Sequence, residues 1–74
     1  MTIEIEIFGQ LGPGLERKQT LTMEHSMTAQ EIANLLGLDL DAIGLISING
    51  VQSELEEPVP MDCRLCFFPP MSGG

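Results

Sequence analysis

The amino-acid sequence predicts a small α+β fold, and three patterns support this prediction. Two stretches near the N-terminus alternate apolar and polar residues with the period of a β-strand. A short stretch with helical spacing and a capping motif follows, and the C-terminal half contains further apolar stretches. A strand hairpin, a helix and more strands are typical of a mixed sheet with a helix laid across one face.

The first two predicted strands are residues 2–8 and 17–24. In the first, isoleucine stands at each odd position from 3 to 7, while threonine and glutamate occupy the even positions from 2 to 6. In the second, Leu21 and Met23 lie on one side and polar residues on the other. Glycines and a proline between residues 9 and 14 break the chain, so we expect the two strands to form a hairpin.

The predicted helix, residues 28–36, begins at a capping box formed by Thr28 and Glu31. The Thr28 hydroxyl can accept a hydrogen bond from the Glu31 amide, and the Glu31 carboxylate can accept one from the Thr28 amide. Gly37 suits the position just beyond the end of a helix. The apolar residues that should face the sheet are Ile32, Leu35 and Leu36.

The C-terminal half contains a predicted strand at residues 45–48, a brief partner near Val51, and a last strand at residues 63–68. Asn49-Gly50 between the first two is a strong hairpin signal. Together the elements predict a β-grasp fold, with a mixed sheet of about four to five strands and one short main helix packed on it. The apolar side chains that we expect in the core are Ile3, Ile5, Ile7, Leu21, Met23, Ile32, Leu35, Leu36, Ile46, Ile48, Leu65 and Phe67.

The length and charge of the chain limit what it can do. A chain of 74 residues makes a single domain with a thin core, which leaves no room for an enclosed active site. Its net charge of −8, with 3 basic and 11 acidic residues, argues against a nucleic-acid partner. We find neither a membrane-length apolar stretch nor a signal-peptide pattern, and we therefore expect a cytoplasmic protein.

Cysteine, histidine and acidic residues in this sequence are better explained by structure than by catalysis. Cys63 and Cys66 have the spacing of a redox or metal motif, but residues three apart on a strand point to opposite faces. We expect Cys63 in the core and Cys66 on the outer face of the sheet. His25 has no identifiable nucleophile partner, and the acidic residues between 54 and 57 lack the spacing of a calcium loop. We predict no metal or cofactor bound by this chain.

The strongest functional candidate is the end of the chain, which we expect to be a flexible tail, residues 69–74, attached to a domain of residues 1–68. The tail consists of Pro69, Pro70, Met71, Ser72, Gly73 and Gly74. Prolines cannot continue a strand ladder, so they stiffen the exit from the last strand. Six residues span at most about 20 Å, and glycine has no side chain to block entry into a narrow channel. The Gly74 carboxylate could be adenylated by ATP, giving an anhydride open to attack by sulfur or an amine.

The last eight residues, from Phe67 to Gly74, resemble the ending of the small subunit of molybdopterin synthase. That family comprises ubiquitin-like β-grasp sulfur carriers and includes the sulfur carrier of thiamine biosynthesis. The resemblance covers the whole chain in the order of elements, and it is specific at residues 48–50 and 68–74. Phe68-Pro69-Pro70 favours the molybdopterin branch, although Met61-Asp62-Cys63 replaces the family's acidic-Gly-Asp turn before the last strand.

The resemblance implies a mechanism in which Gly74 reacts in the active sites of other proteins. An E1-like adenylyltransferase uses ATP and Mg²⁺ to adenylate the carboxylate, and a sulfurtransferase or other persulfide donor converts it to a thiocarboxylate. The tail then enters a large synthase subunit and gives its sulfur to a pterin precursor. By the same resemblance, Phe68, Cys66 and Leu45 would form the docking surface.

Two alternatives remain open from the sequence. Gly74 could instead be joined to lysine amines, as in a ubiquitin-like protein modifier. The sulfur could also serve thiamine, a tungsten cofactor or another sulfur-containing metabolite. In every case the chain has no catalytic residues of its own, and at most it is the sulfur-donating small subunit of a synthase complex.

Overall fold

The computed structural model describes residues 2–9, 11 and 14–70 of the chain. Five strands, one α-helix and one turn of 3₁₀-helix follow one another in the predicted order. Their bounds are β1 Thr2–Ile7, β2 Lys18–Thr22, α1 Ala29–Leu36, η1 Leu40–Ala42, β3 Leu45–Ile48, β4 Val51–Ser53 and β5 Arg64–Phe68. The predicted elements are thus confirmed to within two residues at each end, and only η1 was not expected.

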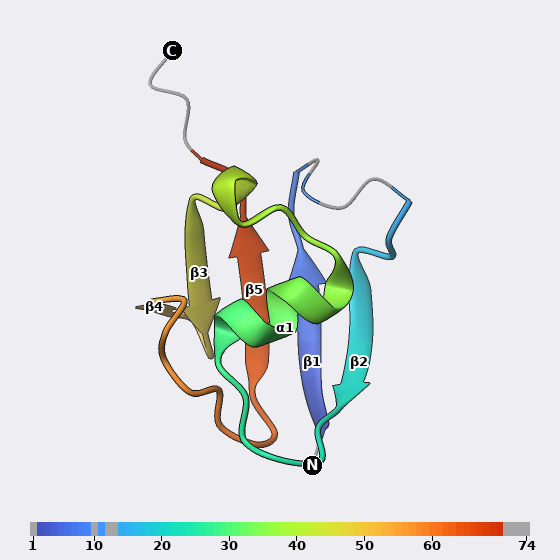
Figure 1. Ribbon diagram of the computed structural model, residues 1–74, viewed down its shortest axis with the longest axis vertical. Helices are drawn as coiled ribbons and strands as arrows, with labels where there is room; N and C mark the ends of the chain where they lie inside the picture. Colours follow the sequence, from blue (N-terminus) through green and yellow to red (C-terminus); the bar gives the residue numbers. More distant parts are fainter. Residues whose placement is uncertain (1, 10, 12–13, 71–74) are drawn as a thin grey trace.

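The five strands form one mixed sheet with the order β2-β1-β5-β3-β4. The central pair, β1 and β5, is parallel, with Ile5 beside Leu65. The other pairings are antiparallel, including the expected β1–β2 hairpin. Figure 1 shows α1 crossing one face of this sheet, which leaves the other face open. This arrangement is the β-grasp fold that the sequence predicts.

The helix begins and ends as its sequence predicts. The Thr28 hydroxyl accepts from the Glu31 amide at 3.2 Å, and the Glu31 carboxylate accepts from the Thr28 amide at 2.9 Å. At the other end, Gly37 has a φ of 80° and Leu38 donates its amide to the carbonyl of Ala33. This hydrogen bond satisfies a carbonyl that the last turn of the helix leaves free, and Leu38 is buried against the core.

The core lies between α1 and the sheet, but one predicted member is wrong. Leu35 is 62% exposed, whereas the helix buries Ala29, Ile32 and Ala33. These three positions, with the partly buried Leu36, form the i, i+3, i+4, i+7 stripe of an amphipathic helix. Two alanines in this stripe let the helix approach the sheet closely, and the same geometry turns Leu35 towards solvent.

Residues outside the predicted elements complete the core. Leu11, Leu38 and Val59 are buried in the same cluster as the strand isoleucines, and Cys63 joins them there as expected. The connection from β4 to β5 reaches the cluster because it is bonded to the start of the helix. The Ala29 amide donates to Glu57 at 3.2 Å, and the Val59 amide donates to Met27 at 2.8 Å.

The β3–β4 hairpin turns at Asn49 and Gly50, which both have positive φ, of 53° and 84°. This is the geometry that Asn-Gly favours. The Asn49 side chain also accepts a hydrogen bond from the Arg64 amide at 3.0 Å, so the turn is tied to the start of β5.

Within the part of the chain that the structure describes, we find no helix with the length and apolarity needed to cross a membrane.

Candidate functional site

The root of the tail lies at the end of the central strand. β5 runs between β1 and β3 and ends at Phe68, on the edge of the sheet where β1 also ends and β3 begins (Figure 1). The Phe8 amide donates to the carbonyl of Phe67, and the Gly44 amide donates to the carbonyl of Phe68, both at 2.9 Å. Pro69 follows and has no amide hydrogen, so the ladder stops there. The chain therefore leaves the sheet with neighbouring backbone on both sides.

Two glycines face the prolines at this exit. A Cβ placed on Gly44 would collide with the Pro70 Cα, and it would lie 2.6 Å from the Pro70 nitrogen and 2.9 Å from the Pro69 carbonyl carbon. A Cβ placed on Gly9 would lie 2.7 Å from Cγ of the Pro69 ring. Neither glycine has a side chain, so the prolines lie directly against the backbone of the domain. Pro69 is half-buried as a result.

An apolar row crosses the open face of the sheet beside this exit. The rings of Phe8 and Phe68 are stacked, with centroids 4.6 Å apart and planes inclined by 5°. Leu45 pairs with Phe68 from the other side and is 38% exposed. The row Phe8, Phe68 and Leu45 thus spans three strands, and both phenylalanines remain half-exposed. Accessible aromatic side chains of this kind are typical of protein interfaces.

Cys66 lies on the same open face but offers little surface. Its neighbours on β5, Leu65 and Phe67, point into the helix-side core, which places Cys66 on the opposite side as expected. It is nevertheless only 7% exposed, and its partner Ser47 on β3 is 8% exposed. Short side chains in the middle of a sheet are shielded by longer neighbours, so Cys66 forms the floor of this surface.

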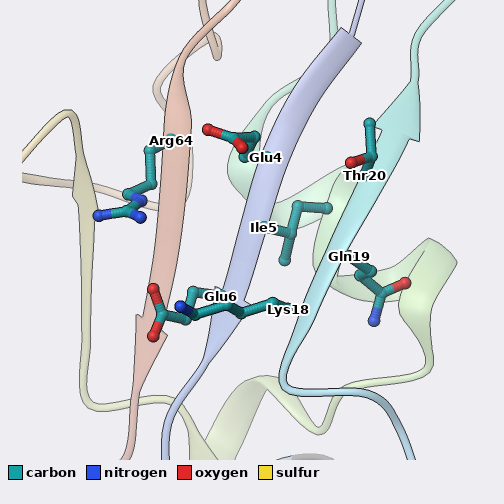
Figure 2. Close-up of a pocket in the computed structure, with 7 residues that line it drawn as sticks. All are labelled: Glu4, Ile5, Glu6, Lys18, Gln19, Thr20 and Arg64. Atoms are coloured by element: carbon teal, nitrogen blue, oxygen red, sulfur yellow. The ribbon is translucent and has the colours of Figure 1, made fainter.

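The remaining open-face strand residues carry balanced charge. Glu4, Glu6, Lys18 and Arg64 line a shallow depression of about 140 Å³ across β2, β1 and β5 (Figure 2). Register pairs Glu6 with Lys18 and Glu4 with Arg64, and Figure 2 shows the Lys18 side chain lying across β1 alongside Glu6. Every other acidic residue lies in a loop, in α1 or in η1. The net charge of −8 therefore comes from residues outside the open face of the strands.

Cys63 belongs to the core and not to a reactive site. It is 2% exposed, and burial, with a smaller contribution from the neighbouring Asp62 carboxylate, raises the pKa of its thiol. A raised pKa disfavours the thiolate, which is the nucleophilic form. Both cysteines are free thiols, in agreement with the expectation that they do not pair.

The structure brings Phe68, Leu45 and Cys66 together on one face, and it places Pro69 and Pro70 at the edge of that face. The predicted site residues Met71, Ser72, Gly73 and Gly74 lie outside the described residues. Sequence reasoning missed Phe8, although the alternation of β1 continued by one residue puts it on the open face. It also missed Gly9 and Gly44, because only the sheet order reveals that both flank the end of β5.

The fold and the open face define the class of the protein as a ubiquitin-like β-grasp domain whose central strand leads directly into the C-terminal residues. Comparison with solved structures supports this class. The crystal structure of SAMP1 from Haloferax volcanii matches with a TM-score of 0.74 and 23% identity, covering all of both chains. A crystal structure of small archaeal modifier protein 1 from the same organism matches with a TM-score of 0.72 and 21% identity, over 95% of this chain and 98% of that one.

A third similar structure comes from a two-subunit assembly. It is a complex of subunits 1 and 2 of molybdopterin-converting factor from Helicobacter pylori 26695, with a TM-score of 0.63, 19% identity and full coverage of both chains. No protein-family model matches the chain, and no curated protein matches it. At the level of the fold, these structures confirm the resemblance to β-grasp sulfur carriers that the sequence indicates.

Proposed function

We propose that this protein is a sulfur carrier that acts through its terminal carboxylate in the synthesis of a molybdenum or tungsten pterin cofactor. The observation that carries the proposal is the course of β5. This strand is held on both sides by neighbouring strands, and it delivers Pro69 and Pro70 to the sheet edge next to an exposed apolar row. A partner that binds the row would receive the residues that follow Pro70.

The proposed chemistry takes place on Gly74. The carboxylate attacks the α-phosphorus of ATP in an E1-like enzyme that supplies Mg²⁺, and pyrophosphate leaves. A persulfide on a sulfurtransferase then displaces AMP, and a thiol cleaves the resulting acyl disulfide to release the thiocarboxylate. In a large synthase subunit this sulfur attacks a pterin precursor, and hydrolysis of the acyl link returns the carboxylate.

The role of this chain is to bind and to present, while the partners supply the catalytic groups. Gly73 and Gly74 have no side chains, so a narrow channel can admit them. The row Phe8, Phe68 and Leu45 provides the apolar contact, and the charged strand residues beside it can select a partner by complementary charge. The likeness to one subunit of a molybdopterin-converting complex supports a large-subunit partner for this face.

A second candidate function is that of a ubiquitin-like modifier. A lysine amine would attack the same adenylate, or a thioester formed from it, in place of sulfur. The likeness in fold to SAMP1 and to small archaeal modifier protein 1 of Haloferax volcanii, with TM-scores of 0.74 and 0.72, supports this candidate. Both candidates use the same exit and the same carboxylate.

Intact-mass spectrometry of the protein purified from its own cells tests the proposal. We expect a fraction whose mass has gained the difference between one sulfur and one oxygen, and the same spectrum checks that Gly74 is the terminal residue. Larger, reductant-resistant conjugates on lysines would support the modifier instead. Deleting Gly73 and Gly74 should abolish both products and leave the unfolding transition unchanged, whereas a Leu35→Ala control on the exposed side of the helix should keep the product. Cofactor synthesis supported by the shortened chain would contradict the carrier, and lysine conjugates of the shortened chain would contradict the modifier.

A further inference from the structure

Position 44 requires glycine because there is no space for a side chain, and not because of its φ. The glycines at positions 9, 14, 37 and 50 have positive φ, which other residues rarely adopt, but Gly44 does not belong to this set. Its backbone would accept alanine without strain. The space beside it would not, because an added Cβ would meet the Pro70 Cα, the Pro70 nitrogen and the Pro69 carbonyl carbon. These are backbone atoms, which can move only if the course of the chain changes.

Gly9 lies against Pro69 on the opposite side of the exit. It follows β1, while Gly44 precedes β3, and these two strands flank β5. An added Cβ on Gly9 would lie 2.7 Å from Pro69 Cγ and 3.2 Å from Pro69 Cδ. The Pro69 ring therefore rests on Gly9, and the Pro69–Pro70 peptide rests on Gly44. Two contacts on opposite sides fix the direction in which the chain departs.

We infer that Gly44, assisted by Gly9, is a positioning residue that fixes the point from which the reactive end of the chain reaches into a partner. This inference rests on the proposed function. The contact holds the chain as far as Pro70, so four residues of sequence separate the held point from the Gly74 carboxylate. Four residues span at most about 14 Å, compared with about 20 Å for the six residues that follow Phe68.

The fixed departure point has a kinetic consequence. The apolar row that binds the partner lies on the sheet, and a substitution at Gly44 leaves its members Phe8, Phe68 and Leu45 in place. A displaced Pro70 moves the carboxylate relative to the docked domain, and misplacement by about 1 Å can cost a hundredfold in rate. Disturbing Gly44 should therefore lower the rate of the chemical step without weakening docking.

The test compares Gly44→Ala with Gly37→Ala in the full chain. Gly37 has a φ of 80° and nothing within 4 Å of an added Cβ, so Gly37→Ala introduces strain and leaves the exit untouched. Adenylation is followed as carrier-dependent exchange of pyrophosphate into ATP, catalysed by the adenylating enzyme from the same cells. We expect Gly44→Ala to lower kcat at least tenfold with KM changed less than twofold, and Gly37→Ala to keep kcat.

Nuclear Overhauser contacts provide a readout that does not depend on a partner. In the wild type we expect contacts of Gly44 with Pro70 and of Gly9 with Pro69. In Gly44→Ala the Pro70 contact should vanish, while the contact between Ile5 and Leu65 persists. An unchanged kcat in a Gly44→Ala variant that has lost the Pro70 contact would overturn the inference.

Pro70→Gly serves as the second variant, because it removes the ring that restricts φ at this position and so frees the course of the chain beside Gly44, while the domain stays intact. It should lower kcat as Gly44→Ala does, and the double variant should be no worse than either single variant, since both changes disturb the same course of the chain. Additive losses would contradict a shared contact. If the wild-type chain itself is not adenylated, the proposed function fails, and that result is distinct from a failure of the positioning role.

Discussion

The two faces of the sheet differ in what covers them and in what their side chains do. On the helix side, Phe67 and Leu65 are fully buried and pack with the isoleucines of β1 under α1. On the open side, Phe68 on the same strand is half-exposed, and its ring stacks on that of Phe8. Adjacent residues of one strand therefore serve stability on one face and, in the proposed function, recognition on the other.

This division gives a chain of 74 residues both a packed core and, on the other face of the same sheet, a partly exposed apolar surface. Its core needs the odd-numbered residues of β1 and β5, whereas the even-numbered ones point to the open face, where all except Cys66 are at least partly exposed. On the open face, the apolar row lies at the end of the sheet where the chain leaves β5. The loops and helix carry the excess negative charge, so the open-face strands stay electrically neutral while the rest of the molecule stays acidic.

The largest expected effect is the loss of stability when a residue of the helix-side face is truncated. Phe67→Ala should destabilise the domain by about 3–5 kcal/mol, because it removes a ring with no solvent exposure and leaves a cavity. A domain of this size has a free energy of unfolding of only about 4–11 kcal/mol, so the variant should be close to unfolded. Chemical denaturation followed by circular dichroism measures the loss. A change below about 1 kcal/mol would mean that the two faces do not differ as described.

The neighbouring substitution should act mainly on binding. Phe68→Ala removes a stacked and half-exposed ring, which costs about 1 kcal/mol of stability. Its affinity for the adenylating partner should fall at least tenfold, as is typical of an aromatic residue central to an interface. Titration calorimetry gives the affinity, and Thr20→Ala, on the same face but away from the row, is the control. Equal affinities for Phe68→Ala and wild type would remove the docking role of the row.

The smallest effect is expected on the outer side of the helix. Leu35→Ala should change the free energy of unfolding by less than about 0.5 kcal/mol, because this leucine is exposed and alanine is the better helix former. Ile32→Ala, three residues earlier and fully buried, is the matched contrast and should cost about 2–5 kcal/mol. Thermal unfolding of both variants checks the assignment of the helix face. Similar losses in the two would indicate that Leu35 is buried after all.

Local patterns of the sequence predicted the elements well for physical reasons. The alternation in β1, the capping box at Thr28 and the Asn49-Gly50 turn each depend on residues only a few positions apart. The prediction that Leu35 faces the sheet is wrong, because the helical spacing of Ile32, Leu35 and Leu36 alone does not decide which side of the helix is buried. The stripe of Ala29, Ile32, Ala33 and Leu36 was present in the sequence and would have identified the buried side.

The candidate site depended more on contacts between distant residues. Phe68 and Leu45 were predicted from the family resemblance, and the register of β3 with β5 brings them side by side. Phe8 joins them because β1 pairs in parallel with β5, sixty residues further along the chain. No local pattern marks Gly44, because its φ does not require glycine. Its role depends on the backbone of Pro69 and Pro70, which lies directly against it.

The sequence by itself determined which residues form strands, where the helix begins and ends, and that Pro69-Pro70 stop the last strand ahead of Met71-Ser72-Gly73-Gly74. These properties follow from periodicity, capping and ring chemistry, which act over a few residues. Only the tertiary structure decided that β5 lies between β1 and β3, and with it that Phe8, Gly9 and Gly44 surround the exit. The reason is that strand order arises from packing between distant segments, and the residues next to Pro69 and Pro70 are set by that order.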